Sequence, residues 1–65
     1  MNRFIEELGF DNRTYNCLKR AGINTVGELC NKTETEIMRI RLMGKNTFVK
    51  LIDKMQQFGL EFKEE

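Results

Sequence analysis

The sequence lacks histidine, tryptophan and proline, and it holds two cysteines among its 65 residues. Without histidine, the side chain that most often serves as general base and metal ligand is missing. Cys17 and Cys30 are thirteen positions apart, whereas a structural zinc site needs cysteines in closely spaced pairs. We therefore expect no metal site, no cofactor and no enzymatic activity in this chain.

Signals for membranes and secretion are also lacking. No apolar run approaches the roughly 18 residues that a membrane span needs. Acidic Glu6 and Glu7 follow the start of the chain before an apolar stretch can form, so no secretory signal is recognisable. These absences predict a cytoplasmic protein whose two thiols are reduced and serve as small apolar side chains. The sequence alone does not decide whether Cys17 and Cys30 form a disulfide.

Length and composition predict one small domain over residues 1–65. Hydrophobic residues make up 40% of the chain and charged residues 32%, which is typical of a soluble globular protein. A chain of this length buries only about 60% of the surface that its unfolded form exposes. We therefore expect a narrow margin of stability.

The formal net charge of +1 hides an uneven distribution of charge. Segment 13–20 carries three basic residues and no acid, and segment 39–54 carries five basic residues and one acid. The rest of the chain carries three basic residues and nine acids. Two basic segments favour an anionic partner such as nucleic acid, although a mixed solvated surface would give the same pattern.

Signals for helix starts and ends recur along the chain, whereas strand-like alternation is hard to find. An N-cap residue stands at 11–12, and threonine and glutamate have capping-box spacing at 25–28 and 33–36. Glycine followed by an apolar residue marks helix ends at 22–23 and 59–60. These signals predict an all-α fold, a compact bundle of four to five short helices with helix–hairpin–helix character. The expected helices are 4–8, 12–21, 26–31, 34–40 and 45–58.

Apolar spacing predicts which side of these helices is buried. In the longest helix, five apolar residues at helical spacing form the expected core stripe: Phe48, Leu51, Ile52, Met55 and Phe58. The N-terminal turn is expected to lay Phe4, Ile5 and Leu8 on the same core.

The turn at 43–47 is the feature with the clearest chemistry. Gly44 would let the backbone approach a ligand closely, and the first amides of the following helix would point at an anion placed there. Lys45 adds a positive charge and Thr47 a hydroxyl group. This arrangement suits a nucleic-acid phosphate, although an ordinary turn between helices, with glycine for its geometry, would read the same way.

Segment 13–26 reads RTYNCLKRAGINTV and closely resembles the start of the C-terminal domain of the bacterial RNA polymerase alpha subunit. The resemblance continues through 28–34, the Gly44-Lys45 turn and the closing segment 58–60. It implies binding of A+T-rich DNA upstream of promoters through the minor groove, and contacts with transcription activators, the sigma factor and the polymerase. An arginine at the place of Arg13 enters the groove in that family. The site residues that it implies are Arg13, Asn16, Cys17, Gly44, Lys45 and Thr47.

Departures from the family pattern bear on DNA affinity. Leu42 stands where the family usually has asparagine, Asn46 replaces a lysine, and Lys50 replaces a common acid. Thr47 replaces a serine and keeps the hydroxyl group. Each lost phosphate contact should weaken binding and flatten the salt dependence by about one unit. The alternative function is therefore a protein-interaction module of the same fold, which binds a regulator or polymerase subunit with little DNA binding.

The side chain of Leu42 has two interpretations at this point. An exposed leucine beside the turn would suit a protein contact, and a buried one would simply pack under the hairpin.

Because the large assembly domain of an alpha subunit is absent from the sequence, the chain is either an excised domain or a free-standing relative, and these departures favour the latter.

Overall fold

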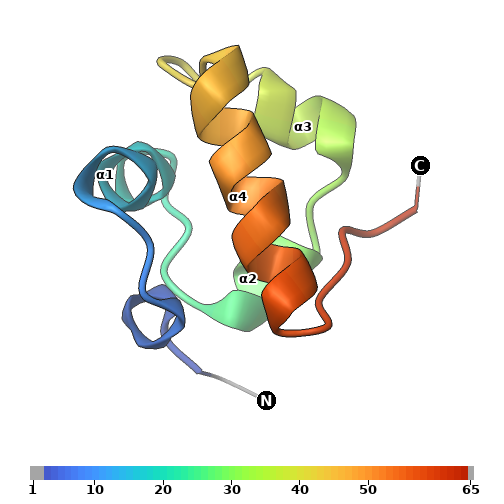
Figure 1. Cartoon of the computed structure of the whole chain (residues 1–65). Coiled ribbons are helices and arrows are strands. Elements are labelled where there is room, and N and C mark those ends of the chain that lie inside the picture. Colours follow the sequence, from blue (N-terminus) through green and yellow to red (C-terminus); the bar gives the residue numbers. More distant parts are fainter. Residues whose placement is uncertain (1–2, 65) are drawn as a thin grey trace.

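A computed structural model describes residues 3–64 of the chain as a bundle of helices (Figure 1). Within these residues there is no strand, and the one isolated β-bridge joins Phe4 to Thr25. The all-α prediction is thereby confirmed. The elements are the 3-10 helix η1 (Ile5–Leu8) and the α-helices α1 (Asn12–Arg20), α2 (Val26–Cys30), α3 (Glu34–Met38) and α4 (Lys45–Gln57).

Local capping explains where the α-helices begin. The Asp11 carboxylate accepts the backbone N–H of Thr14 at 2.9 Å and caps α1. Thr25 forms a complete capping box at the start of α2, since its hydroxyl oxygen accepts the Glu28 amide at 3.1 Å while the Glu28 carboxylate accepts the Thr25 amide at 3.0 Å. Thr33 caps α3 in the same way. Each α-helix ends one or two residues before its predicted end, because the last residue counted from the sequence is a C-cap or lies beyond it.

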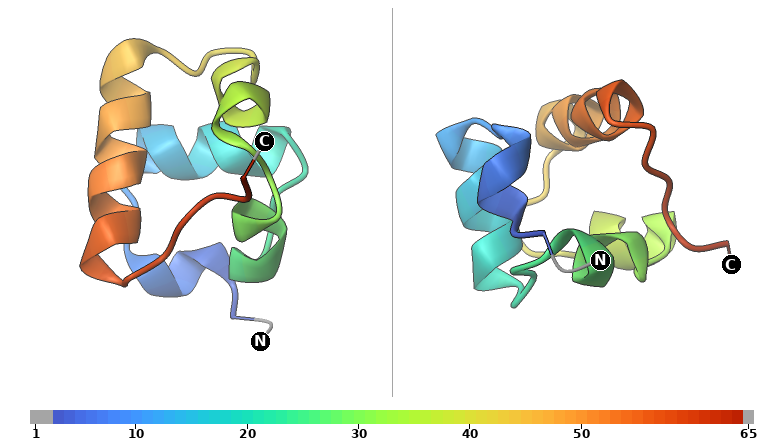
Figure 2. Two further views of the ribbon diagram at one scale, coloured as in Figure 1. Left: turned by 90° about the vertical axis from the view of Figure 1, so that its right-hand side faces the viewer. Right: turned by 90° about the horizontal axis from the view of Figure 1, so that it is seen from below.

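Helix α4 crosses the other elements, with α1 along one side of it and α3 along the other (Figures 1 and 2). Its stripe supplies Leu51 and Met55 to the core, while Phe48 and Ile52 are half-buried. The fully enclosed side chains come from every element and from the loop after α1: Ile5, Leu18, Ile23, Leu29, Ile37, Leu51 and Met55.

Two aromatic residues lie outside the core that the sequence predicts for them. Phe58 is 43% exposed because it is the C-cap of α4, where the chain turns at Gly59 (φ 69°) and brings Leu60 back against the core instead. Phe4 is 58% exposed because its extended backbone pairs with Thr25, while Ile5 beside it is buried. The predicted burial of Phe58 and Phe4 was therefore wrong.

The hairpin between α3 and α4 carries its left-handed residue at an unexpected place. Gly44 has a φ of −78° and serves as the N-cap of α4, so its backbone does not require glycine. The positive φ, 74°, belongs to Leu42, whose side chain is 63% exposed. Packing of Leu42 under the hairpin is thus excluded. A leucine in this conformation costs free energy, because its Cβ crowds the following carbonyl group.

Replacing Leu42 with asparagine should therefore stabilise the domain by about 1 kcal/mol, since asparagine adopts the left-handed region more readily. Urea unfolding of both proteins would measure the gain. The matched control is Leu42→Ala, which keeps the Cβ atom and gains no side-chain amide, so it should leave the strain in place. Equal unfolding midpoints for the asparagine variant and the parent would contradict the assignment of strain to this residue.

Candidate nucleic-acid interface

A hollow of about 530 Å³ lies between α1, the hairpin and the first turn of α4. All of the residues predicted for the site line it, as do three neighbours. Among residues 3–64, the charged residues that line it are all basic and no acidic residue takes part. We call it the basic hollow; its lining residues are Arg13, Asn16, Cys17, Arg20, Leu42, Gly44, Lys45, Asn46 and Thr47.

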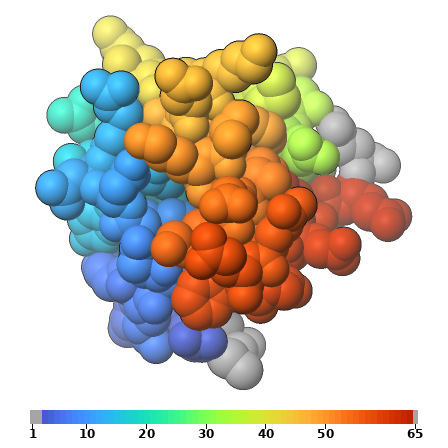
Figure 3. All heavy atoms as spheres, viewed as in Figure 1, coloured from blue at the N-terminus to red at the C-terminus, as the bar shows by residue number. Residues whose placement is uncertain are grey.

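Exposure divides the predicted residues into two groups. Arg13, Asn16 and Lys45 are exposed, as is the backbone at Gly44. Cys17 and Thr47 are only 4% exposed and form the floor. Helix spacing accounts for Arg13 and Asn16, because positions three apart on α1 lie on the same face. In Figure 3 the side chains of α1 (blue) meet those of α4 (orange) along a seam.

Cys17 joins α1 to the hairpin. Its thiol donates a hydrogen bond to the backbone carbonyl of Arg41, with 3.7 Å between Sγ and the oxygen. Burial raises the pKa of this thiol, which keeps it protonated and able to donate. Cys17 therefore fixes the position of the hairpin and does not present a thiolate to the hollow.

The first turn of α4 offers hydrogen-bond donors to the basic hollow. Gly44 provides no side-chain cap, and within residues 3–64 no hydrogen bond occupies the amides of Lys45, Asn46 and Thr47. A Cβ atom added at Gly44 would meet no atom within 4 Å, so the space beside these amides is open. Free amides at the positive end of a helix dipole attract anions, and the exposed Lys45 ammonium group strengthens that attraction.

Lys50, one of the departures from the family pattern, pairs with the cap of α1. Its Nζ atom lies 3.3 Å from Oδ2 of Asp11. Hydrogen bonding from Thr14, together with the Lys50 ammonium group, lowers the pKa of Asp11 to about 2. The lysine thus supports the start of the helix that carries Arg13.

The lowered pKa of Asp11 predicts a change of stability in acid. A carboxylate whose pKa is lower in the folded state stabilises the fold above its ordinary pKa, 3.8, and loses that contribution as the pH falls toward about 2. Asp11→Asn keeps a cap acceptor but cannot titrate, so the stability difference between the parent and this variant should shrink between about pH 4 and pH 2. Urea unfolding at several pH values would measure it. A difference that does not vary with pH would contradict this role of Asp11.

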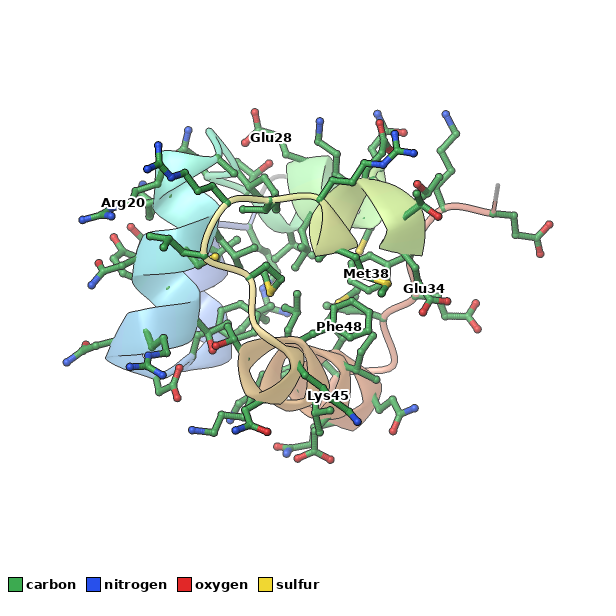
Figure 4. The ribbon with its side chains drawn as sticks, turned by 90° about the horizontal axis from the view of Figure 1, so that it is seen from above. Arg20, Glu28, Glu34, Met38, Lys45 and Phe48 are labelled. Carbon is green, nitrogen blue, oxygen red and sulfur yellow. The ribbon has the colours of Figure 1, made fainter. Side chains whose placement is uncertain are left out.

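The other side of α4 carries a second feature that sequence reasoning missed. Two adjacent hollows, of about 570 and 380 Å³, share Glu34, Ile52 and Gln56. Their acidic residues are Glu34, Asp53, Glu61 and Glu64. We call the two together the acidic groove. Of the described residues, Lys63 is the one basic residue that lines it. Figure 4 shows Glu34 beside Met38 and Phe48, on the opposite side of the hairpin from Arg20.

Packing of the C-terminal segment builds this groove. The Phe62 ring stacks on Phe48 with 6.4 Å between ring centroids, and the Lys63 amide donates to the Lys32 carbonyl at 3.0 Å. Val49, next to Phe48 on α4, is 56% exposed. The sequence signal that could have indicated this surface was Val49, an apolar residue that lies outside the core stripe of α4.

Among residues 3–64, no helix is long and apolar enough to cross a membrane. The same residues contain no group of three or more cysteine and acidic side chains that could hold a metal ion.

Comparison with known proteins decides the family. The sequence model of the C-terminal domain of the bacterial RNA polymerase alpha chain matches residues 1–57. The chain belongs to this family. The alpha subunit of DNA-directed RNA polymerase from Carboxydothermus hydrogenoformans is 51% identical over 61 residues, which are 94% of this chain and 20% of that protein.

Two further alpha subunits give the same result. The one from Symbiobacterium thermophilum is 47% identical over 64 residues, 98% of this chain and 20% of the relative. The one from Desulforamulus reducens is 48% identical over 61 residues, 94% of this chain and 19% of the relative. This alpha-chain domain thus spans about a fifth of the length of the relatives that it matches.

Proposed function

We propose that this domain binds double-stranded DNA as a non-catalytic part of the transcribing polymerase, and that it prefers the minor groove of A+T-rich sequences. The observation that supports the proposal most strongly is the basic hollow. It brings three exposed cations, two exposed amide side chains and an uncapped helix start to one surface, which no acidic residue among residues 3–64 lines.

Each part of the basic hollow has a role in this proposal. The Arg13 guanidinium enters the minor groove, because A+T-rich tracts are narrow and strongly negative there. Asn16, one turn later on the same face, donates to the acceptors of adenine and thymine at the groove floor. The amides that open α4 and the Lys45 ammonium group bind a backbone phosphate, which fixes the orientation of the domain.

Affinity is expected to be low for the domain alone. Asn46 lines the hollow without the charge of a lysine, so one electrostatic phosphate contact is missing. A single domain of this kind should bind in the range of roughly 10⁻⁴–10⁻⁶ M at physiological salt. Tethering to the polymerase would raise the effective concentration at the promoter and compensate for weak intrinsic binding.

An NMR titration of labelled protein with A+T-rich and G+C-rich duplexes, at low and moderate salt, tests the proposal. Shifts should cluster at 13–17 and 44–47 and be larger with the A+T-rich duplex. A folded sample whose signals do not move with either duplex would remove the DNA-binding function.

The acidic groove favours a second function, docking of a transcription activator or the sigma factor. Its apolar floor and acidic rim fit a protein segment in which lysine or arginine flanks an apolar side chain. This groove and the basic hollow lie on different sides of α4, so a regulator could bind while DNA is bound. Signals around Val49 and Ile52 that move with a leucine–lysine helical peptide, and not with its leucine–glutamate counterpart, would support this docking; equal responses to both peptides would contradict it.

A further inference from the structure

A second hollow adjoins the basic hollow on the far side of Leu42. It has a volume of about 640 Å³, and Arg20 and Leu42 line both hollows. Its remaining lining residues are Ala21, Ile40 and Arg41. The exposed leucine therefore stands on a ridge, with Arg13 and Lys45 on one side and Arg41 on the other.

The two arginines of this second hollow are available for a ligand. Both are exposed, and within residues 3–64 neither guanidinium takes part in an ion pair or hydrogen bond with a side chain. The hydrogen bond between the Cys17 thiol and the Arg41 carbonyl holds the hairpin against α1. The helix that carries Arg20 and the loop that carries Arg41 are thus joined close to the leucine.

We propose that Arg20, Arg41 and Leu42 form a second DNA-contact zone, in which the arginines bind backbone phosphates and the leucine packs against the deoxyribose between them. This proposal rests on the proposed DNA-binding function and extends its footprint beyond the residues of the family motif. A DNA strand alternates anionic phosphates with largely apolar sugar faces, and an exposed leucine between two guanidinium groups matches that alternation.

The surroundings of Leu42 favour DNA over a protein as its partner. In the part of the chain that the structure describes, every charged residue that lines the two hollows is basic: Arg13, Arg20, Arg41 and Lys45. A typical apolar protein surface would cover these cations without pairing them, which costs free energy of desolvation. The sugar–phosphate backbone supplies an apolar contact and neutralising charges together.

The zone can be tested by fluorescence anisotropy with one labelled A+T-rich duplex over a series of salt concentrations. Arg20→Gln and Arg41→Gln should each weaken binding and reduce the magnitude of the salt slope by about one, as expected when a phosphate contact is lost. Leu42→Ala should weaken binding roughly fourfold at every salt concentration with an unchanged slope, because it loses no charge and, of the three carbon atoms removed, an area of about one methylene is buried against the sugar.

Arg3→Gln is the matched control, since it removes the same charge from an exposed residue that lines neither hollow. It should leave the slope near that of the parent. Parent-like affinity and slope in the Arg20, Arg41 and Leu42 variants, with binding still sensitive to Arg13→Ala, would overturn the second zone alone. A parent protein that binds no duplex would overturn both the zone and the DNA-binding function.

Discussion

Replacing Arg13 with alanine should weaken binding to an A+T-rich duplex at least about tenfold, the size expected for a base-reading arginine. The guanidinium is exposed and lines the basic hollow, and within residues 3–64 no ion pair holds it. Its removal should therefore reduce binding without loss of structure. Preference for A+T-rich over G+C-rich DNA should fall at the same time, because a narrow groove attracts an inserted arginine most strongly. Anisotropy with both duplexes would measure the affinity and the preference.

Two control variants sharpen this prediction. Arg3→Ala removes an equal charge at an exposed position outside the hollow and should change affinity little. Arg13→Lys keeps the charge but replaces the weakly hydrated planar group with a strongly hydrated one, so it should recover only part of the binding. Affinities that are equal for the parent and the alanine variant would remove groove insertion by this side chain.

Replacing Leu51 with alanine should bring the domain close to unfolding. Leu51 is fully enclosed in the middle of α4, and truncating such a leucine costs about 2–5 kcal/mol. A domain of this length has roughly 3–10 kcal/mol of total stability. Urea unfolding followed by circular dichroism should therefore show a large drop in midpoint, or a protein that is already partly unfolded in buffer.

Val49→Ala on the same helix is the matched control for this truncation. Val49 is more than half exposed, and substitution of an exposed residue usually changes stability by less than about 0.5 kcal/mol. Similar midpoints for the two variants would contradict the placement of the core beneath Leu51.

Helix starts were predictable because the interactions that fix them are local. Asp11, Thr25 and Thr33 cap within three residues of their own position, and the sequence alone contains that information. The environments of Phe4 and Phe58 were not predictable in this way. Phe4 is exposed because its backbone pairs with Thr25, about twenty residues away in the sequence. Phe58 is exposed because the chain reverses after α4 and Leu60 packs against the core in its place.

The residues of the candidate site were likewise predictable only in part. Resemblance to the family supplied residues of the basic hollow, and the structure gathers them on one surface, while their roles toward DNA stay predictions. Arg20 was missed as a lining residue although it stands in the basic segment 13–20, seven positions after Arg13 and so on the same face of the helix. The left-handed backbone of Leu42 was missed because a glycine two positions later was the obvious place for special geometry. The acidic groove needed the C-terminal segment to fold onto α4.

The bond between the Cys17 thiol and the Arg41 carbonyl gives the hairpin a built-in chemical reporter. Cys17 lies beneath the joint of α1 and the hairpin, whereas Cys30 is half-buried elsewhere. Only a thiolate exposed to solvent reacts with a labelling reagent, so Cys17 reacts when the joint opens. The alkylation rate of Cys17, compared with that of Cys30, therefore measures how often the hairpin opens in the native protein. A bound ligand that keeps the hairpin packed against α1 would slow the alkylation of Cys17 and leave that of Cys30 unchanged.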